Sequence, residues 1–276
     1  MDFSKRMILD GAMGSMLLSY GLNPGERSDI QNLINGEAVV DIHKQYIEAG
    51  ADMITANTLG AYSLIYENYD AIIKEAVKHM QTAISASGKK NILTALDMGP
   101  TGKVLEPFGD LSHEECYDAF IQSARAGCEA GVDLILIETM MDLSELKIAV
   151  QAAKTTGLPI IACMSFDKNG RTMMGDDIPK MVIEMENLDV NVIGMNCGYG
   201  PDLYVDLLPL LVKKTRLPII VQPNAGLPVL KDGKPFYNMA PTEFAQQMTK
   251  MTGASLIGGC CGTTPAHIKE MAVLCR

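Results

Sequence analysis

The chain of 276 residues carries 23 basic and 33 acidic side chains, which gives a formal net charge of −10 at pH 7. An acidic chain without a Lys/Arg cluster binds nucleic acid poorly, because neutralised phosphates supply most of the non-specific affinity. No apolar run approaches the roughly 18 residues that a membrane-spanning helix needs. We therefore expect a globular protein with neither a nucleic-acid partner nor a membrane segment.

Seven cysteines occur in the chain, and residues 1–6 do not lead into the apolar core of a signal peptide. Cysteines in a protein that is not exported stay reduced, so we do not expect a disulfide framework. We predict a cytoplasmic protein whose thiols are available for structural, metal-binding or reactive roles.

Short apolar runs alternate along the chain with segments of helical periodicity. The runs read as buried parallel strands, at residues 7–10, 53–57, 92–97, 134–139, 159–166, 190–197, 218–223 and 255–260. The helical segments lie at residues 37–49, 71–86, 114–130, 143–155, 178–187, 202–214, 242–251 and 265–274. Ser112 and Glu115 form a capping box before the third helix. Glycines that favour helix termination follow four helices, at positions 50, 131, 157 and 253.

This alternation predicts an α/β fold with a parallel sheet, because parallel strands need helical crossovers. Eight strand–helix units in 276 residues match the usual size of a (β/α)8 TIM barrel. A doubly wound open sheet is the alternative. No linker or low-complexity tract divides the chain, so we expect a single barrel domain over residues 1–276.

Active sites of such barrels lie at the carboxyl ends of the strands, where the βα loops converge. The polar residues at these ends are Asp10, Asn57, Asp97, Glu138, Ser165, Asn196, Cys197, Asn224, Cys260 and Cys261. We expect the loops to bring them to one mouth.

Three of these residues are cysteines, and they end the sixth and eighth strands, which flank the seventh. Three thiolates with one open position suit Zn2+, which prefers sulfur ligands in tetrahedral geometry. Adjacent cysteines on a strand point to opposite faces, so both reach one ion only where the backbone turns. Glycines at positions 258, 259 and 262 allow that turn.

Other interpretations of these cysteines remain open. The remaining four, at positions 116, 128, 163 and 275, are expected in the core, where cysteine is common. A vicinal Cys260–Cys261 disulfide is disfavoured in a reducing compartment. The loop at residues 262–265 opens a helix, and loops after the last barrel strands often bind phosphate. The residues by themselves therefore leave zinc and phosphate as alternatives.

The run Cys-Cys-Gly-Thr-Thr-Pro at residues 260–265 resembles the signature of the homocysteine S-methyltransferase family. Further matches follow in family order: Ile-Leu-Asp-Gly-Ala-Met-Gly at 8–14, Ile-Leu-Ile-Glu-Thr at 135–139, Met-Asn-Cys-Gly at 195–198 and Pro-Asn-Ala-Gly-Leu-Pro at 223–228. The chain is most similar to the homocysteine-binding module of the cobalamin-dependent methionine synthases. Ser15 and Leu59 depart from the residues common in the family.

The resemblance implies a barrel that holds one zinc ion through Cys197, Cys260 and Cys261, with the homocysteine sulfur as a further ligand. It also implies that Asp10 and Glu138 bind the substrate ammonium group. Backbone amides around residues 12 and 13, which are Ala12 and Met13, would hold the carboxylate.

The residue types fit these roles, with alternatives. An ammonium group needs anions, and Glu138 at the end of an apolar strand needs a partner. Glu138 paired with a loop Lys or Arg is the alternative, as is Asp10 capping the first loop. Asn57 and Asn196 are further candidates for substrate binding, although each, like Asn224, is also suited to shaping a loop. We assign no role to Asp97 or Asn224.

We predict from this resemblance that the protein transfers a methyl group to the zinc-bound thiolate of L-homocysteine and gives methionine. The chain includes no cobalamin-ligand module or nucleotide-binding glycine fingerprint, so the donor is expected from outside. Methylcobalamin on a separate corrinoid protein, or methylfolate acting through it, is the expected donor. The alternatives are S-methylmethionine or betaine as donor, another thiol as acceptor, or a non-catalytic homocysteine- or zinc-binding subunit of a larger assembly.

Overall fold

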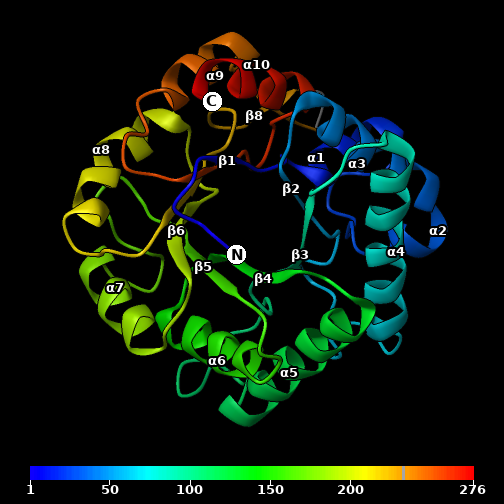
Figure 1. Cartoon of the computed structure of the whole chain (residues 1–276). Helices are drawn as coiled ribbons and strands as arrows, with labels where there is room; N and C mark the ends of the chain where they lie inside the picture. Colours follow the sequence, from blue (N-terminus) through cyan, green and yellow to red (C-terminus); the bar gives the residue numbers. More distant parts are fainter. Residues whose placement is uncertain (232–233) are drawn as a thin grey trace.

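The computed structural model describes residues 1–231 and 234–276, and its main feature is a barrel of parallel strands inside a ring of helices (Figure 1). The barrel strands are β1 (Met7–Ile8), β2 (Met53–Thr55), β3 (Leu93–Met98), β4 (Leu134–Met140), β5 (Ile160–Met164), β6 (Val192–Asn196), β7 (Ile219–Gln222) and β10 (Leu256–Ile257). Their order is β1-β10-β7-β6-β5-β4-β3-β2. A parallel bridge between Leu9 and Met53 joins β1 to β2 and closes the ring. The predicted (β/α)8 fold is confirmed.

Eight helices follow the barrel strands: α3 (Gly36–Ala49), α4 (Tyr69–Ser87), α5 (His113–Ala130), α6 (Leu143–Lys154), α7 (Ile178–Asn187), α8 (Pro201–Val212), α9 (Pro241–Met248) and α10 (Pro265–Cys275). The capping box of Ser112 and Glu115 starts α5. Gly50 and Gly131 end α3 and α5 in left-handed backbone. Among the described residues, no helix is both long and apolar enough to cross a membrane.

Several short elements in the loops were not expected from the sequence pattern. The β1–α3 connection contains α1 (Met13–Leu17), the 3-10 helix η1 (Leu18–Tyr20) and α2 (Gln31–Ile34). The β7–α9 connection contains an antiparallel hairpin of β8 (Val229–Lys231) and β9 (Lys234–Phe236). These elements are too short for a periodicity of apolar residues to develop. Both connections lie at the carboxyl ends of the strands.

Two apolar clusters form the core. The larger one packs the strands against the helices, and the smaller one fills the barrel interior. Phe3, from the amino-terminal segment that crosses the barrel in Figure 1, packs with the interior cluster. Because side chains alternate along a strand, the next inward residues beyond the interior cluster form the floor of the mouth. Five of these residues are polar, and the other three are glycines: Thr55, Asp97, Glu138, Ser165 and Gln222, with Gly11, Gly194 and Gly258.

Candidate functional site

The three cysteines predicted as metal ligands meet at the mouth of the barrel. Their Sγ atoms all lie within 4.8 Å of one another, and those of Cys197 and Cys261 are 4.0 Å apart. Tetrahedral zinc with sulfur at about 2.3 Å requires sulfur atoms roughly 3.8 Å apart. The three partly buried thiols therefore have the spacing and the chemistry of a zinc site with one position left for another ligand.

Backbone turns aim Cys197 at the other two thiols. Cys197 has a φ of 61°, in the left-handed region that non-glycine residues rarely adopt. Its N–H donates to the carbonyl of Gln222 at 3.0 Å, and the hydroxyl of Tyr204 donates to its carbonyl. These contacts to β7 and α8 hold the strained turn in place.

Cys260 and Cys261 are fixed by the loop that joins β10 to α10. The N–H of Cys260 donates to the carbonyl of Pro223 at 2.8 Å, and the carbonyl of Cys261 accepts from Ala225 at 2.9 Å. Gly262 follows with a φ of 79°, and a Cβ there would lie 2.1 Å from the ring of Tyr237. Glycine at position 262 therefore permits both the turn between the cysteines and α10 and the close approach of Tyr237.

Hydrogen bonds within this cluster concentrate negative charge on one sulfur. Donation from Cys197 and Cys260 lowers the pKa of the Cys261 thiol to about 3. The hydroxyl of Tyr237 also donates to Cys261. The cluster thus provides a thiolate that attracts a soft cation.

An adjoining cavity of about 160 Å³ has an acidic lining that includes Cys260 and Cys261. Asp10, Asp97 and Glu138 supply its carboxyl groups, and no Lys, Arg or His is among the described residues that line it. The cavity is therefore suited to a small ligand with a positive group, and it disfavours phosphate.

The hydrogen bonds at the start of α10 also argue against a phosphate site. The Thr264 side chain already accepts from the backbone of the first turn, and His267 completes a capping box with it. The imidazole of His267 also lies 3.0 Å from the carbonyl of Met239. The N–H groups of Thr264 and His267, which could otherwise bind phosphate, are thus in use.

Asp10 and Glu138 both line the cavity, and they differ in their partners. Asp10 is 2% exposed and accepts a hydrogen bond from the Thr55 N–H at 2.8 Å. Burial raises the pKa of Asp10 to about 7. Burial, followed by the charge of Asp10, raises the pKa of Glu138 to about 8. No described Lys or Arg pairs with Glu138, so both groups would gain from a bound cation.

The first loop presents backbone amides to the same cavity. Ala12 and Met13 line it, and Met13 begins α1. The N–H of Ala12 donates to Thr263 Oγ1 at 3.2 Å, whereas the first-turn amides of a helix have no partner within the helix. The free donors for a substrate carboxylate therefore begin at Met13.

The asparagines occupy supporting positions. The Asn57 side chain lines the cavity and donates to the carbonyl of Ser28 at 2.7 Å. Asn196 is fully buried and hydrogen-bonds to Thr139. Asn224 is buried, and its Oδ1 has no partner among the described residues. Of these residues, only Asn57 borders the cavity.

The strand-end pattern missed Gln222 and Tyr237. The predicted seventh strand ends at Pro223, so the pattern selects Asn224 as the strand-end residue. The side chain of Gln222, two residues earlier, is the one that lines the cavity. Tyr237 lies far from the end of any barrel strand, directly after the β8–β9 hairpin. The structure places its ring against Gly262, next to the cysteine pair, and no sequence pattern indicates this contact.

Comparisons with known proteins agree with this geometry. Residues 7–275 match the family described as homocysteine S-methyltransferase. The methionine synthases of Mycobacterium leprae (strain TN) and Mycobacterium tuberculosis (strain ATCC 25618 / H37Rv) are each 33% identical over 96% of this chain. The chain spans 24% of the length of these curated relatives.

Solved structures with a similar fold include the homocysteine methyltransferase MmuM from Escherichia coli. Its apo form is 25% identical, with a TM-score of 0.79 over 98% of this chain and 96% of that one. Its metallated form superposes with a TM-score of 0.83 at 22% identity, over 98% of this chain and 96% of that one. The family match over nearly the full length confirms the resemblance seen in the motifs, and the chain belongs to the homocysteine S-methyltransferase family.

Proposed function

We propose that the protein is a zinc-dependent methyltransferase that converts L-homocysteine to methionine. The observation that carries this proposal is the placement of a three-thiol cluster beside a small acidic cavity. The thiols suit a metal that activates a substrate thiol, and the carboxyl groups suit the ammonium group of an amino acid. Family membership agrees with this pairing.

Cys197, Cys260 and Cys261 would hold the zinc ion. When bound, zinc supplies the acidity that converts a substrate thiol, with a usual pKa near 8.5, into the nucleophilic thiolate at neutral pH. Three cysteine thiolates around Zn2+ carry a net charge of −1. This excess negative charge keeps a neighbouring substrate sulfur electron-rich, whereas neutral histidine ligands would leave the site positive.

The other residues orient the substrate. Glu138 and Asp10 accept hydrogen bonds from the ammonium group, and amides at the start of α1, beginning with Met13, bind the carboxylate. This arrangement directs the side-chain thiol toward Cys260 and Cys261, which line the same cavity. The thiol proton is released, the sulfur forms a bond to the methyl carbon, and the electron pair of the broken bond stays with the donor.

The methyl donor is proposed to come from outside the chain, carried as methylcobalamin by a corrinoid protein or supplied by methylfolate through it. At about 160 Å³ the cavity is smaller than the roughly 300 Å³ of pockets for drug-sized molecules. In this proposal the cavity holds homocysteine, the methyl acceptor, and the methyl donor approaches over the βα loops that form the rim of the barrel mouth. That rim displays large apolar side chains on four βα connections: Leu59, Val104, Phe108, Met173, Met174, Leu227, Val229, Leu230 and Phe236.

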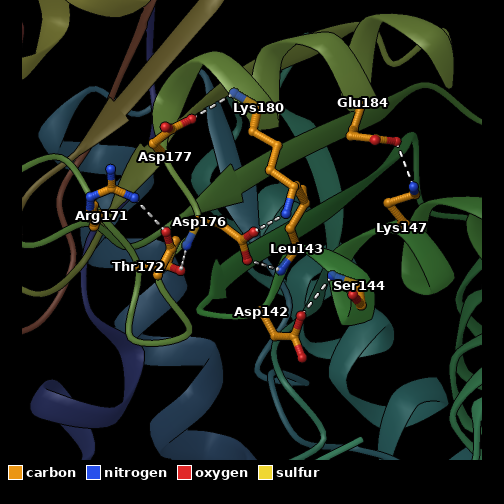
Figure 2. Close-up of polar contacts among 11 residues, drawn as sticks. Asp142, Leu143, Ser144, Lys147, Arg171, Thr172, Asp176, Asp177, Lys180 and Glu184 are labelled. Atoms are coloured by element: carbon orange, nitrogen blue, oxygen red, sulfur yellow. Dashed lines mark hydrogen bonds and ion pairs between the residues drawn. The ribbon is translucent and has the colours of Figure 1, made fainter. Parts of the chain in front are cut away.

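Polar contacts anchor part of this rim (Figure 2). Asp176 accepts from the Leu143 N–H at 3.1 Å and forms an ion pair with Lys180 at 2.6 Å. These contacts tie the loop that carries Met173 and Met174 to the starts of α6 and α7. Exposed apolar side chains on a fixed support favour a macromolecular carrier of the methyl group.

Proton release on substrate binding tests the acceptor. L-Homocysteine added to reduced, zinc-loaded protein near pH 7 should release at least one proton per zinc, measured calorimetrically in buffers of different ionisation enthalpy. No release from protein shown to hold zinc would contradict the proposal and favour another thiol. For the donor, turnover confined to S-methylmethionine or betaine would contradict a corrinoid carrier. Rapid turnover of free methylcobalamin would exclude a purely binding subunit.

A further inference from the structure

Asp97 is a buried carboxyl group whose side chain has no hydrogen-bond partner among the described residues. It lies at the end of β3, is 9% exposed, and lines the cavity with Asp10 and Glu138. Its Oδ1 is enclosed and accepts no hydrogen bond from the described residues. A buried acceptor without a donor costs free energy, more so when it is charged, so such a group points to a ligand that supplies the donor.

A second enclosed acceptor lies on the same floor. Gln222 is 3% exposed, lines the cavity from the end of β7, and its Oε1 also lacks a donor among the described residues. The two orphaned acceptors belong to different strands and face one cavity. A ligand with several N–H donors and no acceptor at that end would satisfy both.

The carboxyl groups clustered around Asp97 favour a cation as this ligand. Burial, and then the charges of Glu138, Asp10 and Asp29, raise the pKa of Asp97 well above its usual range. The described residues gather three metal-ligating atoms within 4.8 Å only at the cysteine cluster, so the carboxyl groups do not form a compact metal site. An ammonium group, with one charge and three donors, matches this more open arrangement.

We propose that Asp97 binds the α-ammonium group of the substrate together with Glu138 and is the residue that makes this ammonium group a requirement for acceptor binding. The inference rests on the proposed function and extends it. Asp10 also accepts from the ammonium group, but its carboxyl group is shared with the Thr55 N–H. The Asp97 carboxyl group has no such second contact among the described residues, so its removal should affect ligand binding and no other interaction.

The test compares L-homocysteine with 4-mercaptobutyrate, the same thiol acid without the amino group. Binding of both is measured by calorimetry on zinc-loaded wild type and Asp97→Asn. We expect the variant to bind L-homocysteine about 10- to 100-fold more weakly, as for a lost hydrogen bond to a charged group. Its affinity for 4-mercaptobutyrate should stay within about two-fold of the wild type, because that ligand makes no contact with Asp97.

Asp29→Asn is the matched control, since Asp29 is a buried acid near Asp97 that does not line the cavity. It should leave the preference between the two thiols unchanged. Asp97→Ser is the second variant should the amide perturb folding, and it should show the same loss. An unchanged preference in a folded Asp97 variant would overturn the assignment of Asp97 alone.

Failure of the proposed function has a different signature. If wild-type protein that holds zinc bound neither thiol, both the proposed acceptor and the Asp97 assignment would be wrong. If it bound the two thiols equally, with proton release, thiol capture would stand and the assignment of Asp97 would fall.

Discussion

The side-chain amide of Asn196, at the end of β6, makes two hydrogen bonds to Thr139, at the end of β4. Asn196 Oδ1 accepts from the Thr139 N–H at 2.7 Å, and its Nδ2 donates to the Thr139 hydroxyl at 2.8 Å. Thr139 has a φ of 60° and lies in an irregularity of β4, directly after Glu138. Asn196 therefore holds the strained turn that aims Glu138 into the cavity.

Asn196→Ala should weaken substrate binding, although Asn196 itself does not line the cavity. Loss of both contacts leaves a buried N–H unpaired, which typically costs about 1–3 kcal/mol of stability. We expect a raised KM for L-homocysteine with zinc content unchanged, measured by steady-state kinetics and metal analysis. Asn191→Ala, which removes a similar contact from the Ile160 N–H at the opposite end of the barrel, is the comparison and should leave KM unchanged. An Asn196→Ala variant with normal stability and a normal KM would show that the Asn196–Thr139 hydrogen bonds do not position Glu138.

Cys197→Ser and Cys261→Ser should each lose most of the bound zinc and the activity while the barrel remains folded. The reason is that the three thiols lie at the mouth, outside both apolar clusters. Metal analysis and circular dichroism measure the two properties. Cys275→Ser, at the end of α10, removes a thiol away from the site and should change neither. Full zinc content and activity in both site variants would refute the ligand set.

Tyr237→Phe should weaken the hold on zinc, since the hydroxyl donates to the Cys261 sulfur. Loss of a partner that orients a metal ligand typically costs about 10- to 100-fold in metal affinity. Competition with a chromophoric chelator gives the affinity. Tyr69→Phe, on the outer helix α4, is the control. Equal zinc affinity in Tyr237→Phe and wild type would show that the hydroxyl does not support the ligand.

Stability without substrate should fall as the pH rises from about 4 to 8. The folded protein raises the pKa of Asp10 to about 7 and that of Glu138 to about 8, and it also raises the pKa of Asp97. These three carboxyl groups outnumber Cys261 and His43, whose lowered pKa values act in the opposite direction, so in this range the folded protein binds more protons than the unfolded chain. Stability then decreases with pH, by up to about 1.4 kcal/mol for each unit of pKa shift.

Glu138→Gln removes one of these groups and should flatten that dependence. Urea unfolding at pH 5 and pH 8 should show a loss smaller by about 3 kcal/mol than in the wild type. Glu243→Gln, which changes a carboxyl group on the first turn of α9, should retain the wild-type slope. A wild-type protein that gains stability from pH 5 to pH 8 would contradict the ionisation proposed here.

Met173→Glu should impair methyl transfer from a corrinoid protein more than transfer from free methylcobalamin. Met173 is 78% exposed on the rim, so a charge there disturbs docking and leaves the cavity intact. Val273→Glu, on α10 at 71% exposure, is the control away from the rim. The two donors are compared by initial rates. An equal effect on both would argue against a docking role for this loop.

Periodicity and strand-end chemistry were enough to predict the barrel, its eight outer helices and most of the residues at the mouth, although not Gln222 or Tyr237. In a parallel barrel all strands end on one side, so a list of strand-end residues is already a list of neighbours. That reasoning placed Asp10, Glu138 and the three cysteines. The family motifs then supplied the expected ligand and substrate.

Tertiary structure decided which of those side chains have partners of their own. Asn196 binds Thr139 and Asp10 binds Thr55, whereas Asp97 Oδ1 has no donor among the described residues. Each outcome depends on loops that meet from distant parts of the chain. Tyr237 reaches Cys261 only through the hairpin after β7. Position along a strand determines the direction of a side chain, but hydrogen bonding depends on what other segments bring to it, and the sequence pattern does not contain that information.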